Sequence, residues 1–539
     1  MNGLRSIMVK RVAAAKPLRS FVILSVVVAM SLAGGALRAQ EIDAAQRIAA
    51  QVDELLRQAW EAGNIVAAPK ADDAEFLRRV SLDLRGRIPP ASEVRDFVAD
   101  ASVDKRARKI DELLSSPTFI VHYTNVWRAA MVPEADADQA VRFQLPGFEA
   151  WLRARIAENR DFSKIAVEML TLPSPAQQMA AIPGDSIASP LVFYTAKEQD
   201  PARLTSAAAR LFLGLRLDCA QCHDHPFDDW RQEQFWGLAA FFHEFEEEAA
   251  GSRDDEQTVQ IAIPDVDRVV SARFLDGQTP DWSSGKPARA VLADWVTSPD
   301  NPYFAKATVN RLWAAMFGVG LVDPADDFGR NNPPSHPEIL DLLASSFVEH
   351  GYDIKFILRV IANTHAYQLT SRLTDPSQEV PRTFARMPIR GMTPEQIFDS
   401  LAQAIGYRQP FDPEQPLNFN NDQVRQEFLE TFAAEAGSVT DRETSILQAL
   451  ALMNGTLTVE ATDLADSQTL AAVVDAPFLR PEERVDALYL STLSRYPTEA
   501  EREYCLAYVS KPGPNGDSAD RFADLFWALL NSNEFLLNH

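Results

Sequence analysis

The sequence predicts a mainly α-helical protein with two helical domains joined by a short β-containing linker. Three observations predict this fold class. Apolar residues recur at helical spacing along most of the 539-residue chain. Glycine and proline stand at the ends of these segments, where they interrupt little. Short runs of β type occur in one stretch, between Gly251 and Pro280.

Residues 1–39 predict a secretory signal peptide. They contain basic residues but no acidic ones, then an apolar run from Phe21 to Ala33, then small residues up to Ala36. The apolar run is shorter than a typical membrane span. We therefore expect export to the periplasm, the cell surface or the extracellular medium, with no transmembrane span after signal removal.

A first helical domain is expected over residues 40–250. Apolar periodicity and capping residues define its helices, and Asp72 and Gly86 mark the start and end of one of them. The predicted helices are Ile42–Ala62, Ala74–Leu84, Ser92–Val98, Asp104–Leu114, Phe119–Met131, Phe148–Asn159, Ser163–Leu170 and Pro201–Leu213.

A linker is expected over residues 251–283 and a second helical domain over residues 284–539. The runs 258–263 and 268–274 predict a small β-hairpin in the linker. The second domain begins with a predicted helix at Ala288–Trp295. Near its end, helices are predicted to start at Pro481 and Thr498, because acidic residues follow each in the first turn.

The segment Cys219-Ala-Gln-Cys222-His223 has the C-x-x-C-H spelling of a c-type haem attachment site. Two thiols three residues apart on one helical turn can form thioethers to the two vinyl groups of a single porphyrin. The following imidazole, His223, then becomes an axial ligand of the iron. Covalent haem c is therefore the favoured cofactor, and export agrees with it because bacteria attach this haem outside the cytoplasmic membrane.

Other chemistries of the same cysteines stay open. The two thiols could join His223 and His225 in a zinc site, although the spacing is tighter than in zinc fingers. They could also form a disulfide or a dithiol redox pair. Asp224, His225 and Asp228 are candidate metal ligands or hydrogen-bond acceptors that orient the histidines. Candidates for a second axial ligand are His122, Met169, Met179, His243 and His336.

The formal net charge of −24 disfavours nucleic acid and anionic lipid as partners, and a redox partner would be basic. A second polar cluster in the second domain contains Arg311, Asp326, Asp327 and His336. It is read either as a cation or sugar site or as a salt bridge between domains. Ser335 is expected to cap the helix that follows it.

Longer strings of the chain resemble a known family. They include residues 71–89, residues 219–242, residues 310–329 and residues 332–343. These strings resemble a planctomycete secreted family that pairs domain of unknown function 1549, also called planctomycete cytochrome-like, with domain of unknown function 1553. The resemblance covers almost the whole chain after residue 39, and its cytochrome label rests on the same C-x-x-C-H string.

Three functions are expected from these observations. The first is an exported c-type haem protein for electron transfer or for redox chemistry on a small oxidant. The second is a secreted hydrolase or accessory protein for breakdown of sulfated polysaccharide, which would use the second-domain polar cluster. The third is a cell-surface structural protein whose cysteines bind zinc or form a disulfide.

Overall fold

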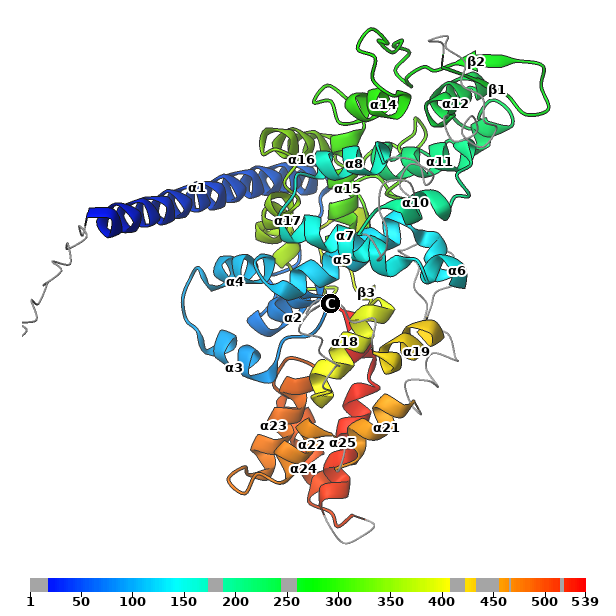
Figure 1. Ribbon diagram of the computed structural model, residues 1–539. Coiled ribbons are helices and arrows are strands. Elements are labelled where there is room, and N and C mark those ends of the chain that lie inside the picture. The colour runs from blue at the N-terminus through cyan, green and yellow to red at the C-terminus, as the bar shows by residue number, and fades with distance from the viewer. Residues whose placement is uncertain are drawn as a thin grey trace, which may run out of the picture.

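The computed structural model describes residues 18–172, 188–243, 259–407, 422–432, 455–464, 467–513 and 518–539. The side chains of residues 18–40, 456, 457 and 460 lie outside this description. The described chain is mainly α-helical and contains two small antiparallel sheets. The predicted fold class is therefore confirmed. Figure 1 shows the helix α1 projecting from one side of the molecule, and the C-terminus lying in its middle.

The described residues up to 242 form α-helices, short 3₁₀ turns and one π turn, η2. The α-helices are α1 (Leu18–Gly63), α2 (Asp73–Arg85), α3 (Ala91–Ala99), α4 (Lys105–Leu114), α5 (Pro117–Met131), α6 (Gln139–Arg142), α7 (Leu145–Ala157), α8 (Phe162–Leu170), α10 (Leu191–Thr195), α11 (Pro201–Ala208) and α12 (Gln232–Ala239). The turns are η1 (Pro133–Asp136), η2 (Ala209–Leu213), η3 (Asp218–Gln221) and η4 (Ala240–Phe242).

The caps predicted for α2 are present. The Asp72 side chain accepts a hydrogen bond from the backbone N–H of Glu75, and Gly86 ends the helix in the left-handed conformation at φ 77°. The helix predicted over Ser92–Val98 begins one residue earlier, at Ala91, and Pro90 and not Ser92 occupies its N-cap position. The predicted signal peptide falls partly on residues 1–17, which lie outside the described residues.

The segment before the cysteine motif changes its helical pitch. The predicted helix from Pro201 consists of α11 followed by one π turn, η2, over Ala209–Leu213. Single π turns are rare and are frequently found at functional sites. Gly214 then stops the helix at φ 68°, as its sequence position predicted.

The predicted hairpin forms from β1 (Gln260–Ala262) and β2 (Val269–Ser271), with Ile261 opposite Val270. Both strands pack against α12, and the backbone N–H of Arg273 donates to the carbonyl of Gly237 in that helix. The hairpin therefore belongs structurally to the cysteine-bearing part of the chain.

The remaining chain is again helical. Its α-helices are α14 (Ala288–Val296), α15 (Phe304–Phe317), α16 (Pro337–Glu349), α17 (Ile354–Asn363), α18 (Pro394–Ile405), α19 (Gln423–Phe432), α21 (Thr456–Thr462), α22 (Gln468–Val474), α23 (Pro481–Thr492), α24 (Glu499–Val509), α25 (Ala519–Leu530) and α26 (Asn533–Leu536). Its short turns are η5 (Ala366–Gln368), η6 (Pro376–Gln378) and η7 (Pro381–Thr383), and β3 (Arg390–Gly391) pairs antiparallel with β4 (Leu537–Asn538). Thr498 and Glu501 form a reciprocal capping box at α24.

Two apolar cores hold the described residues together. The first takes in buried residues between Ala45 and Met387, together with Leu490, and the second takes in Leu82 and Ile88 together with buried residues between Met392 and Phe535. The helix α2 contributes to both, because Phe76 and Val80 lie in the first core and Leu82 in the second. The packing therefore divides near residue 390, and the described part of the predicted linker, residues 259–283, contributes buried residues to the first core. None of the described helices is long and apolar enough to cross a membrane.

The carboxyl group of Asp53 links α1 to the start of η5. Its Oδ1 accepts a hydrogen bond from the backbone N–H of His365 at 2.7 Å. Burial raises the pKa of Asp53 to about 6 in spite of this bond. The folded chain therefore binds a proton that the unfolded chain has lost between about pH 4 and pH 6, and this contribution to stability is lost as the pH rises through that window.

We expect Asp53→Asn to stabilise the protein at pH 7.5 by about 1 kcal/mol, a value reduced for the partial exposure of the group. The amide oxygen still accepts the His365 N–H and carries no charge. Denaturant unfolding of both proteins at pH 4 and pH 7.5 measures this. His365 titrates in the opposite sense because burial lowers its pKa, but it is present in both proteins. An equal stability difference at the two pH values would contradict the prediction.

Candidate functional site

The cysteine motif lies on the surface, on a turn whose apolar residues are buried in the first core. Cys219 and Cys222 are free and exposed, as is His223. Cys219 lies in η3 and Cys222 is the residue that ends this turn. Leu215, Leu217 and Ala220 are buried in the first core. The burial pattern therefore turns the small apolar side chains inward and leaves both thiols in solvent.

Side chains of α12 hold the backbone of the motif. The Trp236 indole N–H donates to the carbonyl of Gln221 at 2.9 Å, and the Gln232 amide donates to the carbonyl of Cys222 at 2.9 Å. The Asp224 carboxylate accepts a hydrogen bond from the backbone N–H of Gln232 at 2.9 Å. These bonds satisfy the carbonyls that a 3₁₀ turn leaves free and fix the motif to the helix that follows it.

Hydrogen-bond partners assign the tautomers of the two histidines. His223 Nδ1 lies 2.7 Å from the backbone carbonyl of Asp224, which can only accept, so Nδ1 carries the proton and Nε2 presents a lone pair. His225 Nδ1 accepts from the backbone N–H of Phe227 at 3.3 Å, so its proton is on Nε2. His223 is thus prepared as a metal ligand through Nε2, with the carbonyl orientation that many ligating histidines have.

The residues of the motif fit covalent haem in chemistry. Two free thiols and an imidazole with an available Nε2 are the donors that the C-x-x-C-H arrangement requires. A closed zinc site would need four ligands directed at one point. Among the described residues, no three His, Cys, Asp or Glu side chains form a group that could hold a metal ion. The carboxylate of Asp224 bonds Gln232 N, and that of Asp228 bonds the N–H of Asp229, so neither bonds a histidine ring.

The proposed second axial ligands are distributed over the fold. Met169 is buried in the first core, and His122 is buried beside Gly86 at the end of α2. Burial lowers the pKa of His122 to about 4, so it is neutral. His243 directly follows η4. His336 precedes α16, and Met179 lies outside the described residues.

A loop of the second domain contacts the segments on both sides of the cysteine motif. This loop, residues 318–332, is called the clamp loop below. Its Phe328 N–H donates to the carbonyl of Gly214 at 2.8 Å, and its Asp326 pairs with Arg216 at 2.7 Å. Beyond the motif, the Asn331 amide donates to the carbonyl of Phe227. The structure thus brings two segments together that are about a hundred residues apart in sequence.

The polar cluster predicted in the second domain is only partly assembled. Asp326 forms the interdomain ion pair, but with Arg216 and not with Arg311. Arg311 donates to the carbonyl of Arg210 at 3.1 Å, and burial lowers its pKa. The backbone carbonyl of Asp327 accepts from Asn332 in the clamp loop itself.

His336 lies apart from this contact. Its Nδ1 is 3.1 Å from Ser335 Oγ, its ring packs on Phe384, and burial lowers its pKa to about 4. The prediction that Ser335 caps α16 was wrong. Pro337 takes the first helical position, which makes His336 the N-cap residue, and Ser335 Oγ instead donates to the carbonyl of Leu321.

An open depression lies where the motif segment meets the clamp loop. Its volume is about 530 Å³, and it is lined by Pro226, Phe227, Asp228, Asp229, Arg330 and Asn331. Phe227 is 77% exposed although its carbonyl and its N–H both have hydrogen-bond partners. Asp228, Asp229, Arg330 and Asn331 make the lining of the depression mainly polar, and the exposed ring of Phe227 contributes an aromatic surface.

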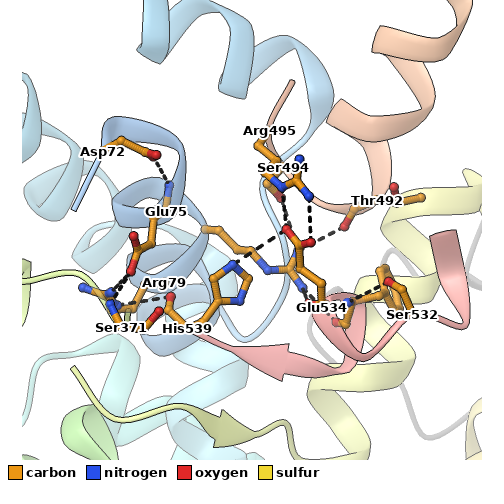
Figure 2. A network of polar contacts seen from close by, with 12 residues as sticks. Asp72, Glu75, Arg79, Ser371, Thr492, Ser494, Arg495, Ser532, Glu534 and His539 are labelled. Carbon is orange, nitrogen blue, oxygen red and sulfur yellow. Dashed lines mark hydrogen bonds and ion pairs between the residues drawn. The ribbon is translucent and has the colours of Figure 1, made fainter. Parts of the chain in front are cut away.

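A buried polar network where the two cores meet was missed by sequence reasoning. Arg78 and Arg79 of α2 are 1% and 0% exposed. Figure 2 shows Glu75 and Arg79 of this helix beside His539, and Arg495 beside Glu534. The available signal was the stretch from Phe76 to Leu84, in which three charged residues stand among apolar ones. In the structure every residue of this stretch is buried. A helix that is buried on all sides forces such charges to find partners.

Arg78 closes the ends of two helices. Its Nη1 donates to the carbonyl of Thr492, the last residue of α23, at 3.0 Å. Its Nη2 donates to the carbonyls of Glu534 and Phe535 in α26, at 3.1 Å and 2.8 Å. Helix C-termini carry partial negative charge, which stabilises a buried guanidinium there together with the nearby carboxylate of Glu534. Burial still lowers the pKa of Arg78 to about 10.

Asp83 holds the other side of the network. It is 4% exposed and accepts hydrogen bonds from the Tyr367 hydroxyl at 2.6 Å, from Arg390 at 2.9 Å and from the Asn538 amide at 2.7 Å. Its three donors come from η5, β3 and β4. These hydrogen bonds connect α2 to β4. Because the Asp83 carboxylate is buried and surrounded by donors, we assign it a structural role.

Comparison with known proteins supports the division of the sequence into two domains. Residues 51–247 match the family described as Protein of unknown function (DUF1549), and residues 288–509 match the family described as Protein of unknown function (DUF1553). Neither a curated protein nor a solved structure matches the chain. The pairing predicted from the sequence is confirmed. The chain therefore belongs to the proteins that join a DUF1549 domain to a DUF1553 domain.

Proposed function

We propose that this protein is an exported c-type haem protein that transfers electrons or reduces a small oxidant. The observation that carries the proposal is the state of the motif: two free, exposed thiols beside a histidine whose Nδ1 donates to a carbonyl. A dithiol of structural type would instead be buried or paired. Haem, when bound, supplies one-electron chemistry.

The residues of the chain have separate tasks in this proposal. Cys219 and Cys222 would hold the haem covalently through their sulfurs. His223 would bind the iron through Nε2, and the carbonyl of Asp224 keeps its Nδ1 protonated and its ring oriented. Trp236 and Gln232 hold the backbone between the thiols, so that both sulfurs stay on the outer side of the turn.

Exposure of the motif has a consequence for the redox potential. Solvent around a haem stabilises the more highly charged oxidised iron and lowers the potential. The net charge of −24 also favours encounter with a basic redox partner.

The proposal is tested by haem staining of the denatured protein after export from a host with haem-attachment machinery. We expect a stained band for the unchanged chain and none for Cys219→Ser with Cys222→Ser. Cys505→Ser is the matched control, because Cys505 is buried against Tyr489 and far from the motif in sequence. It should stain like the unchanged chain. Absence of stain in all three proteins would overturn the proposal.

A further inference from the structure

We propose that Asn310 of the second domain is a positioning residue for the C-x-x-C-H segment, and that it acts through the clamp loop. The motif would then be a site made by both domains, although every cysteine and histidine of it belongs to the first. The redox part of this inference rests on the proposed haem function, and the mechanical part does not.

The clamp loop is attached to α15 through Asn310. Asn310 is 0% exposed. Its amide donates to the carbonyls of Val322 and Ala325 at 2.8 Å and 3.3 Å, and its oxygen accepts from the Val322 N–H at 2.9 Å. These bonds use both functional ends of the amide, so a substitution leaves buried backbone groups of the loop without partners.

The clamp loop also contacts the entry to the motif. The Phe328 N–H donates to the carbonyl of Gly214, and a Cβ on Gly214 would lie 2.7 Å from the Phe328 ring. A side chain at Gly214 would therefore collide with the Phe328 ring. The left-handed φ of 68° at this position is a second reason for glycine. Two residues further on, Arg216 pairs with Asp326 of the same loop.

The clamp loop contacts the exit from the motif as well. The Asn331 amide bonds the carbonyl of Phe227, and Asp228 Oδ2 lies so close to Gly329 that a Cβ there would come within 2.6 Å. The pair between Arg330 and Asp229 is largely exposed and adds little. Contacts within the first domain fix the centre of the motif, whereas the clamp loop fixes the spacing of its two ends.

The test uses Asn310→Ala with Asn301→Ala as the matched control. Asn301 is also a buried asparagine next to α15, with three hydrogen bonds, to Trp295 O, Tyr303 N and Phe304 N. It lies at the other end of the helix from the clamp loop. Hydrogen exchange of the haem-free chain is measured for peptides that cover residues 214–230 and residues 318–332.

We expect Asn310→Ala to speed exchange in both peptides by about tenfold, beyond any change in Asn301→Ala, because hydrogen bonds of buried groups are lost. Asn310→Asp keeps the acceptor and loses the donor, so it should fall between the two. Faster exchange confined to residues 318–332 would overturn the proposal. If Asn310→Ala does not fold, exchange in Asn310→Asp decides by the same criterion.

The haem-loaded chain gives a second measurement. A shift of the midpoint potential in Asn310→Ala, with no shift in Asn301→Ala, is expected if the loop sets the orientation of His223. An unchanged potential would limit Asn310 to a structural role and overturn its assignment as a positioning residue. A chain that takes up no haem at all defeats the proposed function, while the exchange experiment still decides whether the clamp loop holds the motif.

Discussion

Replacement of Arg78 by Met is expected to lower the free energy of unfolding by about 3–5 kcal/mol. Methionine fills a similar volume but leaves the carbonyls of Thr492, Glu534 and Phe535 without their donor inside the protein. It also removes the cation that stabilises the C-terminal ends of α23 and α26. Denaturant unfolding followed by far-UV circular dichroism measures the change.

A matched control distinguishes this effect from loss of charge in general. Arg57→Met removes an arginine from α1 whose ion pairs to Glu54 and Glu61 are exposed, and its effect on stability should be much smaller than that of Arg78→Met. Arg78→Lys should lie between the two, because a single ammonium group cannot reach acceptors on two helices. A loss below about 1 kcal/mol for Arg78→Met would show that the two helix ends do not depend on this side chain.

Replacement of Asp83 by Asn is the second change with a large expected effect, also about 3–5 kcal/mol. It leaves the partly buried guanidinium of Arg390 without its carboxylate and sets an amide against the Asn538 amide. Arg390→Met alone should cost a similar amount, since it leaves the Asp83 charge unpaired. Because the two residues share one ion pair, the double variant should cost clearly less than both single changes together.

Denaturant unfolding of these four proteins gives the coupling free energy. A coupling of about 2 kcal/mol or more is expected for a buried pair. Additive costs would mean that the Asp83 and Arg390 side chains act independently and that the contact does not join α2 to β3. The Tyr367 hydroxyl, which also donates to Asp83, is unchanged in all four proteins.

Local features of the fold could be predicted because they depend on a few neighbouring residues. Asp72 and Gly86 define α2, and Thr498 with Glu501 defines the start of α24, by hydrogen bonds within one helical turn. The wrong cap predictions also concern the choice between neighbouring residues. At α16 the preference of Pro337 for the first helical position outweighed the capping tendency of Ser335.

The composition of the site could be predicted only in part. The C-x-x-C-H pattern alone made Cys219, Cys222 and His223 candidate site residues. The polar cluster of the second domain was proposed from its residue types. The partner of Asp326 was not, because the choice between Arg311 and Arg216 depends on how two distant segments pack. The contact of the clamp loop with Gly214 and the interdomain role of Arg78 are likewise long-range results that no local spacing encodes.

The most direct test of the account is peptide mapping by mass spectrometry of the exported chain, with alkylation of its thiols after denaturation. We expect the peptide with Cys219 and Cys222 to carry one covalent haem and to take up no alkylating reagent, while the Cys505 peptide is alkylated. Alkylation of both Cys219 and Cys222, with or without prior reduction, would contradict it.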